Sequence, residues 1–213
     1  MERKTLKFSY EGVYQLSHEP NFREKEIWIC FHGYGQLTQF FMRKFMPFDR
    51  EDRLFITPEG TNYQYLQNFQ GRVGANWMTK HERELAITNN HQFLEQLTSQ
   101  ILEKYEQIPE INVLGFSQGA ATATRWAAVW PKTIRRLLLW SGGFAQDLNF
   151  DLGKSNFKNT ELYLVYGDQD EFLTEESFNK QKEILKELGK KAIIKDFSGG
   201  HELPHKVLAE FMN

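Results

Sequence analysis

The sequence has only one cysteine, nearly balanced charge and no long apolar run. Cys30 is the single cysteine among 213 residues, so no internal disulfide is expected. It lies in the apolar run 27–31, which predicts a buried, reduced side chain rather than a catalytic thiol. The formal net charge is −2, and nucleic-acid binding usually needs a basic surface. We therefore expect no nucleic-acid partner.

Targeting and linker signals are also missing. The charged segment 1–5 is not followed by an apolar stretch, which argues against a signal peptide. No apolar run approaches the length of a bilayer-spanning helix, so we expect no integral membrane segment and a cytoplasmic protein. Repeats, low-complexity tracts and Pro/Gly-rich linkers do not stand out. Together with 40% hydrophobic and 25% charged residues, this predicts a single globular domain over 1–213.

What is present is an alternation of short β-branched or aromatic runs with longer helical patterns. An N-terminal antiparallel hairpin is expected from runs 6–10 and 13–16 around Glu11-Gly12. Further strands are expected over 27–31, 54–56, 111–114, 136–140, 162–166 and 192–197. Helices are expected over 37–46, 82–105, 118–130, 175–188 and 204–212. This order predicts an α/β fold with a mostly parallel central sheet and helices on both faces.

The segment Gly115-Phe116-Ser117-Gln118-Gly119 follows a predicted strand and precedes a predicted helix. This is the context in which a G-x-S-x-G turn presents a nucleophilic serine. The turn is sharp, and side chains two residues either side of the serine would collide with neighbouring backbone. The structural alternative is a serine that simply caps the following helix.

A serine nucleophile needs a base and a carboxylate that orients it. Of six histidines, only His201 follows a strand downstream of Ser117, at the flexible Gly199-Gly200 turn. Asp168 and Asp170 both follow strand 162–166, and either would complete the order Ser, Asp, His. We favour Asp170, because an aspartate directly after a turn glycine often bonds its own backbone. Asp147 and Asp196 are less well placed.

These motifs, together with Phe-His-Gly-Tyr-Gly at 31–35, resemble the phospholipase/carboxylesterase branch of the α/β-hydrolases, which includes the acyl-protein thioesterases. The resemblance runs from about residue 27 to the end and implies that Asp170 is the carboxylate. Two departures stand out: Tyr166-Gly167 where the family usually has His-Gly, and 171–174 where it has Pro-x-Val-Pro. The second lies beside the expected pocket, so it bears on the substrate.

Acyl transfer needs backbone N–H donors aimed at the developing oxyanion. One should be the N–H of Gln118, and the second should come from loop 32–35; the resemblance implies Tyr34. We interpret His32 as a structural support of that loop.

The expected apolar pocket comprises Trp77, Met78, Phe144, Phe172 and Leu203. For each of these residues, ordinary core packing is the alternative. The long stretch 58–80 is expected to be irregular, and its part 61–80 to cover the site partly.

The segment His201-Glu202-Leu203-Pro204-His205 also matches the zinc-protease pattern H-E-x-x-H. That pattern needs a continuous helix, which Pro204 disfavours.

Taken together, these motifs predict a serine hydrolase of small acyl esters or thioesters, without a cofactor. A non-catalytic binding protein on a hydrolase scaffold stays the alternative, followed by a zinc hydrolase. Acyl chain length, a lysophospholipid substrate and a homodimer stay open.

Overall fold

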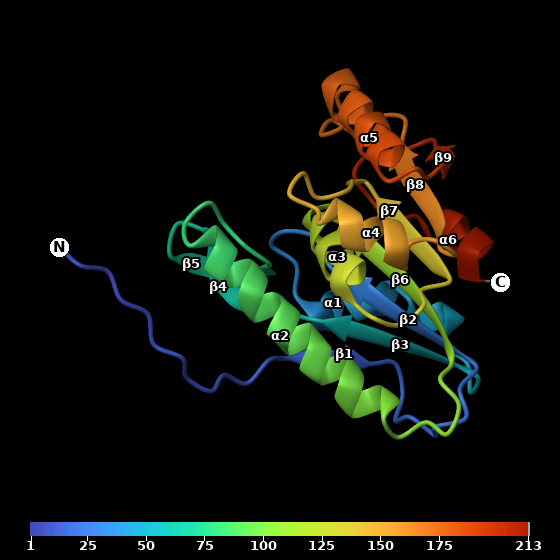
Figure 1. Ribbon diagram of the computed structural model, residues 1–213, viewed down its shortest axis with the longest axis horizontal. Coiled ribbons are helices and arrows are strands. Elements are labelled where there is room, and N and C mark those ends of the chain that lie inside the picture. Colours follow the sequence, from blue (N-terminus) through green and yellow to red (C-terminus); the bar gives the residue numbers. More distant parts are fainter. Residues whose placement is uncertain (213) are drawn as a thin grey trace.

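The computed structural model describes residues 1–212 of the chain, and its centre is a seven-stranded sheet (Figure 1). The strand order is β1-β3-β2-β6-β7-β8-β9; β1 is antiparallel to β3, and the other neighbours are parallel. The strands are Tyr14–Leu16 (β1), Glu26–Phe31 (β2), Arg53–Pro58 (β3), Glu110–Phe116 (β6), Arg136–Trp140 (β7), Glu161–Gly167 (β8) and Ala192–Phe197 (β9). The mostly parallel α/β architecture is therefore confirmed.

Helices cover both faces of this sheet, as expected (Figure 1). One face packs against Arg83–Leu102 (α2), Gln118–Val129 (α3), Phe150–Asn156 (α4) and Glu175–Glu187 (α5). The other packs against Thr38–Phe41 (α1), the 3-10 turns Met42–Lys44 (η1) and Met46–Phe48 (η2), and His205–Met212 (α6). Within residues 1–212, none of the helices combines the length and apolarity that crossing a bilayer requires.

The central strands are apolar on both sides, because alternate residues face opposite layers. In β2, Ile27, Ile29 and Phe31 join the cluster beneath α2 and α3, whereas Trp28 and Cys30 join the cluster beneath α1 and α6. Cys30 is fully buried, and burial raises the pKa of its thiol well above the ordinary value. The prediction of a buried structural cysteine is confirmed.

The N-terminal antiparallel pairing is present, but its partner is β3, with Tyr14 opposite Pro58 and Leu16 opposite Ile56. The run 6–10 forms no strand, and Leu6, Phe8 and Tyr10 are exposed. A two-stranded hairpin is only marginally stable by itself, whereas β3 offers the edge of a buried sheet. The prediction of a hairpin turn at Glu11-Gly12 is therefore wrong.

Two other local predictions need correction, and one helix was missed. The stretch expected to be irregular holds a second, two-stranded antiparallel sheet, Asn62–Gln67 (β4) and Gln70–Asn76 (β5). The helix expected over 37–46 is one α-helical turn followed by two 3-10 turns, the second of which contains Pro47. The short helix α4 was not predicted, because its pattern Phe150–Asn156 is barely two turns long and contains a glycine.

Candidate active site

The expected site residues gather at the carboxyl edge of the sheet, where the strand order reverses. From β2 the chain moves outward to β3 and then returns to β6 on the opposite side of β2. The ends of β2 and β6 therefore form the kind of crevice in which open α/β sheets bind ligands. The loop 32–37 follows β2, Ser117 follows β6, and the loops with Asp170 and His201 follow β8 and β9.

Ser117 has the strained backbone of a nucleophilic turn, with φ 54° and ψ −120°. A Cβ on Gly115 would lie 2.5 Å from the Cα of Ala120. A Cβ on Gly119 would lie 2.6 Å from the His32 carbonyl oxygen and even closer to that of Phe31. Ser117 precedes α3, but its side chain makes no capping hydrogen bond, so the capping alternative is wrong.

Asp170 and His201 form the carboxylate–imidazole pair. The Nδ1 atom of His201 lies 3.0 Å from Oδ1 and 2.9 Å from Oδ2 of Asp170. Oδ1 also accepts the backbone N–H of Phe172 at 3.1 Å. The Asp170 carboxylate is fully buried, so these donors replace water around its charge. The contact fixes the orientation of the His201 ring through Nδ1.

The imidazole of His201 is placed against two aromatic rings. Its ring centre lies 5.0 Å from that of Phe116, the residue before Ser117, and 4.8 Å from that of Phe172. Among residues 1–212 the structure gives no hydrogen bond between Ser117 and His201. Such catalytic contacts are often long without substrate and tighten when it binds.

Asp168 ties the two loops together. Its Oδ1 accepts the N–H of Gly199 at 3.0 Å, and the N–H of Gln169 donates to the Gly199 carbonyl at 2.9 Å. The expectation that Asp168 bonds its own turn is therefore corrected, because its partner lies 31 positions away on the β9 loop. These bonds hold the segment with Asp170 against the segment with His201.

The loop after β2 is held by His32, as expected. Its Nδ1 donates to the Gly33 carbonyl at 2.7 Å and its Nε2 accepts the N–H of Gly60 at 2.9 Å. One donor and one acceptor define a neutral imidazole, and burial lowers the pKa of His32 to about 4. Tyr34 is half exposed, and its hydroxyl accepts a hydrogen bond from the Gln64 side chain of β4.

The five expected pocket residues fall into two groups. Met78 is partly exposed, and Phe172, which packs on His201, is 64% exposed. Trp77, Phe144 and Leu203 are at most 4% exposed and belong to the apolar clusters. The structure thus shows core packing for these three, and only Met78 and Phe172 are accessible to a substrate.

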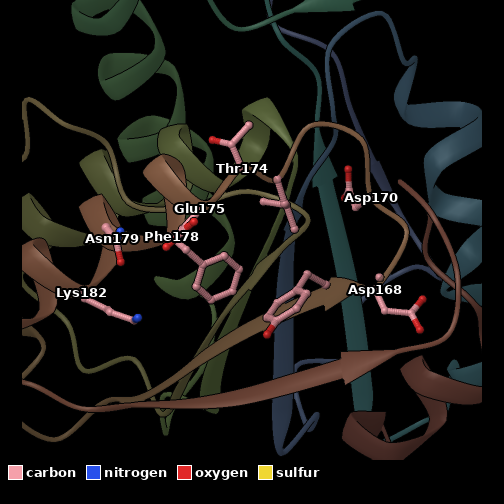
Figure 2. Close-up of a pocket in the computed structure, with 10 residues that line it drawn as sticks. Asp168, Asp170, Thr174, Glu175, Phe178, Asn179 and Lys182 are labelled. Atoms are coloured by element: carbon pink, nitrogen blue, oxygen red, sulfur yellow. The ribbon is translucent and has the colours of Figure 1, made fainter.

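A separate cleft of about 320 Å³ is lined by residues of the Asp170 loop and of α5 (Figure 2). It opens between the end of β8 and the first turns of α5, and Phe178, Asn179 and Lys182 of α5 line one wall. Ser117 and His201 are not among its lining residues. Asp170, which lines this cleft, directs its carboxylate to His201, so the contact between the two side chains lies outside the group of residues that line the cleft.

The H-E-x-x-H segment does not form a helix through both histidines. Residues 201–204 precede α6, which begins at His205. His201 is bound to Asp170, whereas the ring of His205 stacks on Phe48 at 4.8 Å. Among residues 1–212 no group of three or more His, Cys, Asp or Glu side chains is arranged as metal ligands. The geometry that the zinc pattern requires is therefore not found in this segment.

The strand order, the strained serine turn after β6 and the Asp-His pair define an α/β-hydrolase. The sequence matches the family described as Phospholipase/Carboxylesterase over residues 17–213. The chain belongs to this family and is a hydrolase. A search of the curated proteins gives no match.

Solved structures of similar fold include hydrolases of this kind. Esterase PE8 is 18% identical, with 95% of this chain and 97% of that chain covered and a TM-score of 0.70. Acyl-protein thioesterase 2 of Zea mays is 16% identical, with 95% and 96% covered and a TM-score of 0.68. A phospholipase/carboxylesterase of Dyadobacter fermentans DSM 18053 is 16% identical, with 97% and 98% covered and a TM-score of 0.68. At these identities the likeness concerns the fold.

Proposed function

We propose that this chain hydrolyses small acyl esters or thioesters through an acyl-enzyme on Ser117, with His201 as general base and Asp170 as its orienting carboxylate. One observation carries the proposal. The imidazole of His201, bound to the Asp170 carboxylate, lies at the same edge of the sheet as Ser117, whose backbone is strained and whose side chain makes no capping hydrogen bond. The contact between His201 and Asp170 joins loops 31 positions apart, and a serine that only capped a helix would need neither of these two residues.

The proposed reaction has two steps. Ser117 Oγ attacks the acyl carbon while its proton passes to Nε2 of His201, which then protonates the leaving alcohol or thiol. A water then loses a proton to the same nitrogen, attacks the acyl-enzyme and releases the acid. Throughout, Asp170 keeps the proton on Nδ1 and stabilises the imidazolium.

The developing oxyanion would lie between the N–H groups of Gln118 and Tyr34. Gln118 begins α3 immediately after Ser117, and Tyr34 lies on the loop that packs against the serine turn at Gly119. The acyl group would extend over Met78 and Phe172, the accessible apolar side chains. This short apolar wall would bear on the length of the acyl chain.

The test is hydrolysis of 4-nitrophenyl acetate by the native chain and by two alanine variants. Ser117→Ala is expected to lower kcat by about 10⁶-fold, as for a comparable serine nucleophile. Ser99→Ala, on the exposed face of α2, serves as the matched control and should retain full activity. Unchanged turnover in Ser117→Ala would remove this residue from its role.

The same assay separates the alternatives. A native chain that folds but hydrolyses none of a panel of acyl esters and thioesters would support a binding protein on a hydrolase scaffold. Loss of activity with a chelator, restored by Zn²⁺, would support the zinc pattern at His201 and His205. We expect full activity with the chelator and complete loss with a serine-directed fluorophosphonate.

A further inference from the structure

Trp77 is fully buried, yet all of its polar groups are paired with residues of other segments. Its backbone N–H donates to Oε1 of Gln118 at 3.0 Å, and its indole N–H donates to the His32 carbonyl at 2.8 Å. Its carbonyl accepts from the Asn90 side chain of α2 at 2.7 Å and from Asn62 of β4 at 3.3 Å. Trp77 therefore joins four segments: the serine turn, the loop after β2, the two-stranded sheet β4–β5 and α2.

Two of these contacts reach the two halves of the proposed oxyanion hole. Gln118 carries one of the N–H donors on its backbone, and its side chain holds both Trp77 and the carbonyl of Met78, the latter at 2.9 Å. His32 lies two residues before Tyr34, the other donor. Its carbonyl oxygen lies between the Trp77 indole and the backbone of Gly119.

We propose that Trp77 and the Gln118 side chain are positioning residues that set the separation of the two oxyanion donors. The inference rests on the proposed function. An oxyanion hole stabilises charge only when its donors already lie within hydrogen-bond distance of the oxygen in the transition state. A bridge from Gln118 through Trp77 to His32 supplies that fixed separation with neutral, hydrogen-bonded groups. Neither side chain needs to touch the substrate.

The chain offers a matched control for this bridge. Trp126 is also buried, and both indoles pack on Phe31, with ring centres 5.4 Å away for Trp77 and 5.7 Å for Trp126. Among residues 1–212, the Trp126 indole N–H has no hydrogen-bond partner. A Trp→Phe change at either position thus removes similar volume beside the same ring, but only at position 77 does it break a hydrogen bond.

The experiment compares 4-nitrophenyl acetate with its thiono analogue, in which sulfur replaces the carbonyl oxygen. Sulfur is larger and a weaker acceptor, so it gains little from correctly spaced donors. Trp77→Phe and Gln118→Met should lower kcat for the oxygen ester about 10- to 100-fold, somewhat less than the loss of a whole donor. The KM should change little, and the thiono rate should fall less than about threefold. Trp126→Phe should keep the native ratio of the two rates.

The inference would be overturned if the ratio of the oxygen-ester rate to the thiono-ester rate stayed native in both Trp77→Phe and Gln118→Met. It would also be overturned if Trp126→Phe lowered this ratio as much as Trp77→Phe does. Should Trp77→Phe fail to fold, the partly exposed Gln118→Met decides the question. Failure of the proposed function is a different result, because the native chain would then hydrolyse neither ester.

Discussion

The carboxylate of Asp170 holds the imidazole of His201 through Nδ1, at 3.0 and 2.9 Å from its two oxygens. The pair joins the loops after β8 and β9, and Asp168 and Gly199 support the same junction from the side. In the proposed mechanism, Nε2 is the nitrogen that exchanges a proton with Ser117. The proton position on His201 therefore depends on the charge at residue 170.

Asp170→Asn is expected to lower kcat by about 10⁴-fold, because an amide at this position favours the wrong tautomer of the base. Asp168→Asn is the matched control, since its amide oxygen can still accept the N–H of Gly199 and activity should stay near native. Steady-state kinetics on 4-nitrophenyl acetate measures both. Equal losses in the two variants would mean that the loop junction matters and the carboxylate of Asp170 does not.

The buried His32 predicts a loss of stability in acid. Burial lowers its pKa from 6.5 to about 4, so the folded chain binds fewer protons than the unfolded chain between these values. The contribution of neutral His32 to the free energy of unfolding is complete above pH 6.5. It is lost as the pH falls toward 4, and the loss is at most about 3 kcal/mol. Urea titrations across this range should show a smaller pH dependence in His32→Gln than in the native chain.

The control is His205→Gln, at an exposed histidine, and the reduction in pH dependence should be larger in His32→Gln than in this variant. His91, whose pKa burial also lowers, contributes with the same sign in every variant, so only differences between variants are compared. If the free energy of unfolding of His32→Gln depended on pH as strongly as that of the native chain, this result would contradict a neutral His32 in the folded chain.

The close approach at Gly119 predicts a steric requirement for glycine. Gly119→Ala would place a methyl group against the carbonyls of Phe31 and His32, and we expect it to destabilise the fold by at least about 2 kcal/mol. Gly200→Ala, whose nearest neighbour would lie 3.9 Å away, should cost little. Urea denaturation measures the free energy of unfolding of both variants. Equal values would show that a methyl group fits at position 119 without a steric clash.

The exposed ring of Phe172 predicts an effect on substrate choice. Phe172→Ala should raise KM for octanoyl and longer esters while leaving acetyl ester hydrolysis nearly unchanged, because only the longer chains reach this ring. An acyl series assayed as oxygen esters and as thioesters measures the effect. An equal loss across all chain lengths would indicate that Phe172 supports His201 instead of the acyl chain.

Local patterns predicted most of the sheet and helices and the serine turn, because each depends on neighbouring residues. The strand β7 matches its expected range, and α3 and α5 each end one residue earlier than expected. The strand partner of β1 and the hairpin β4–β5 were missed, and the core packing of Trp77 was expected only as the alternative to a pocket role. The pairing of β1 with β3 depends on residues distant in sequence. In contrast, β4 and β5 pair locally, but they are mostly exposed and polar, so they lack the pattern of a buried strand.

The site shows the same division. Motif, chain order and the family resemblance pointed to the strained turn at Ser117 and to the pairing of Asp170 with His201, both of which the structure contains; their catalytic roles stay predictions. The bridge from Gln118 through Trp77 to His32 had no local signal, because Trp77 lies 41 positions from Gln118 and 45 from His32. Glutamine and tryptophan are also common as ordinary surface and core residues, so their types alone did not indicate a positioning role.

The most direct test of the mechanism is intact-protein mass spectrometry of chain quenched in acid during turnover of 4-nitrophenyl acetate, followed by peptide mapping. We predict one acetyl group, on the peptide that contains Ser117, with no adduct in Ser117→Ala. Turnover at the native rate with no acetylated species, or with the acetyl group on another residue, would contradict the acyl-enzyme mechanism.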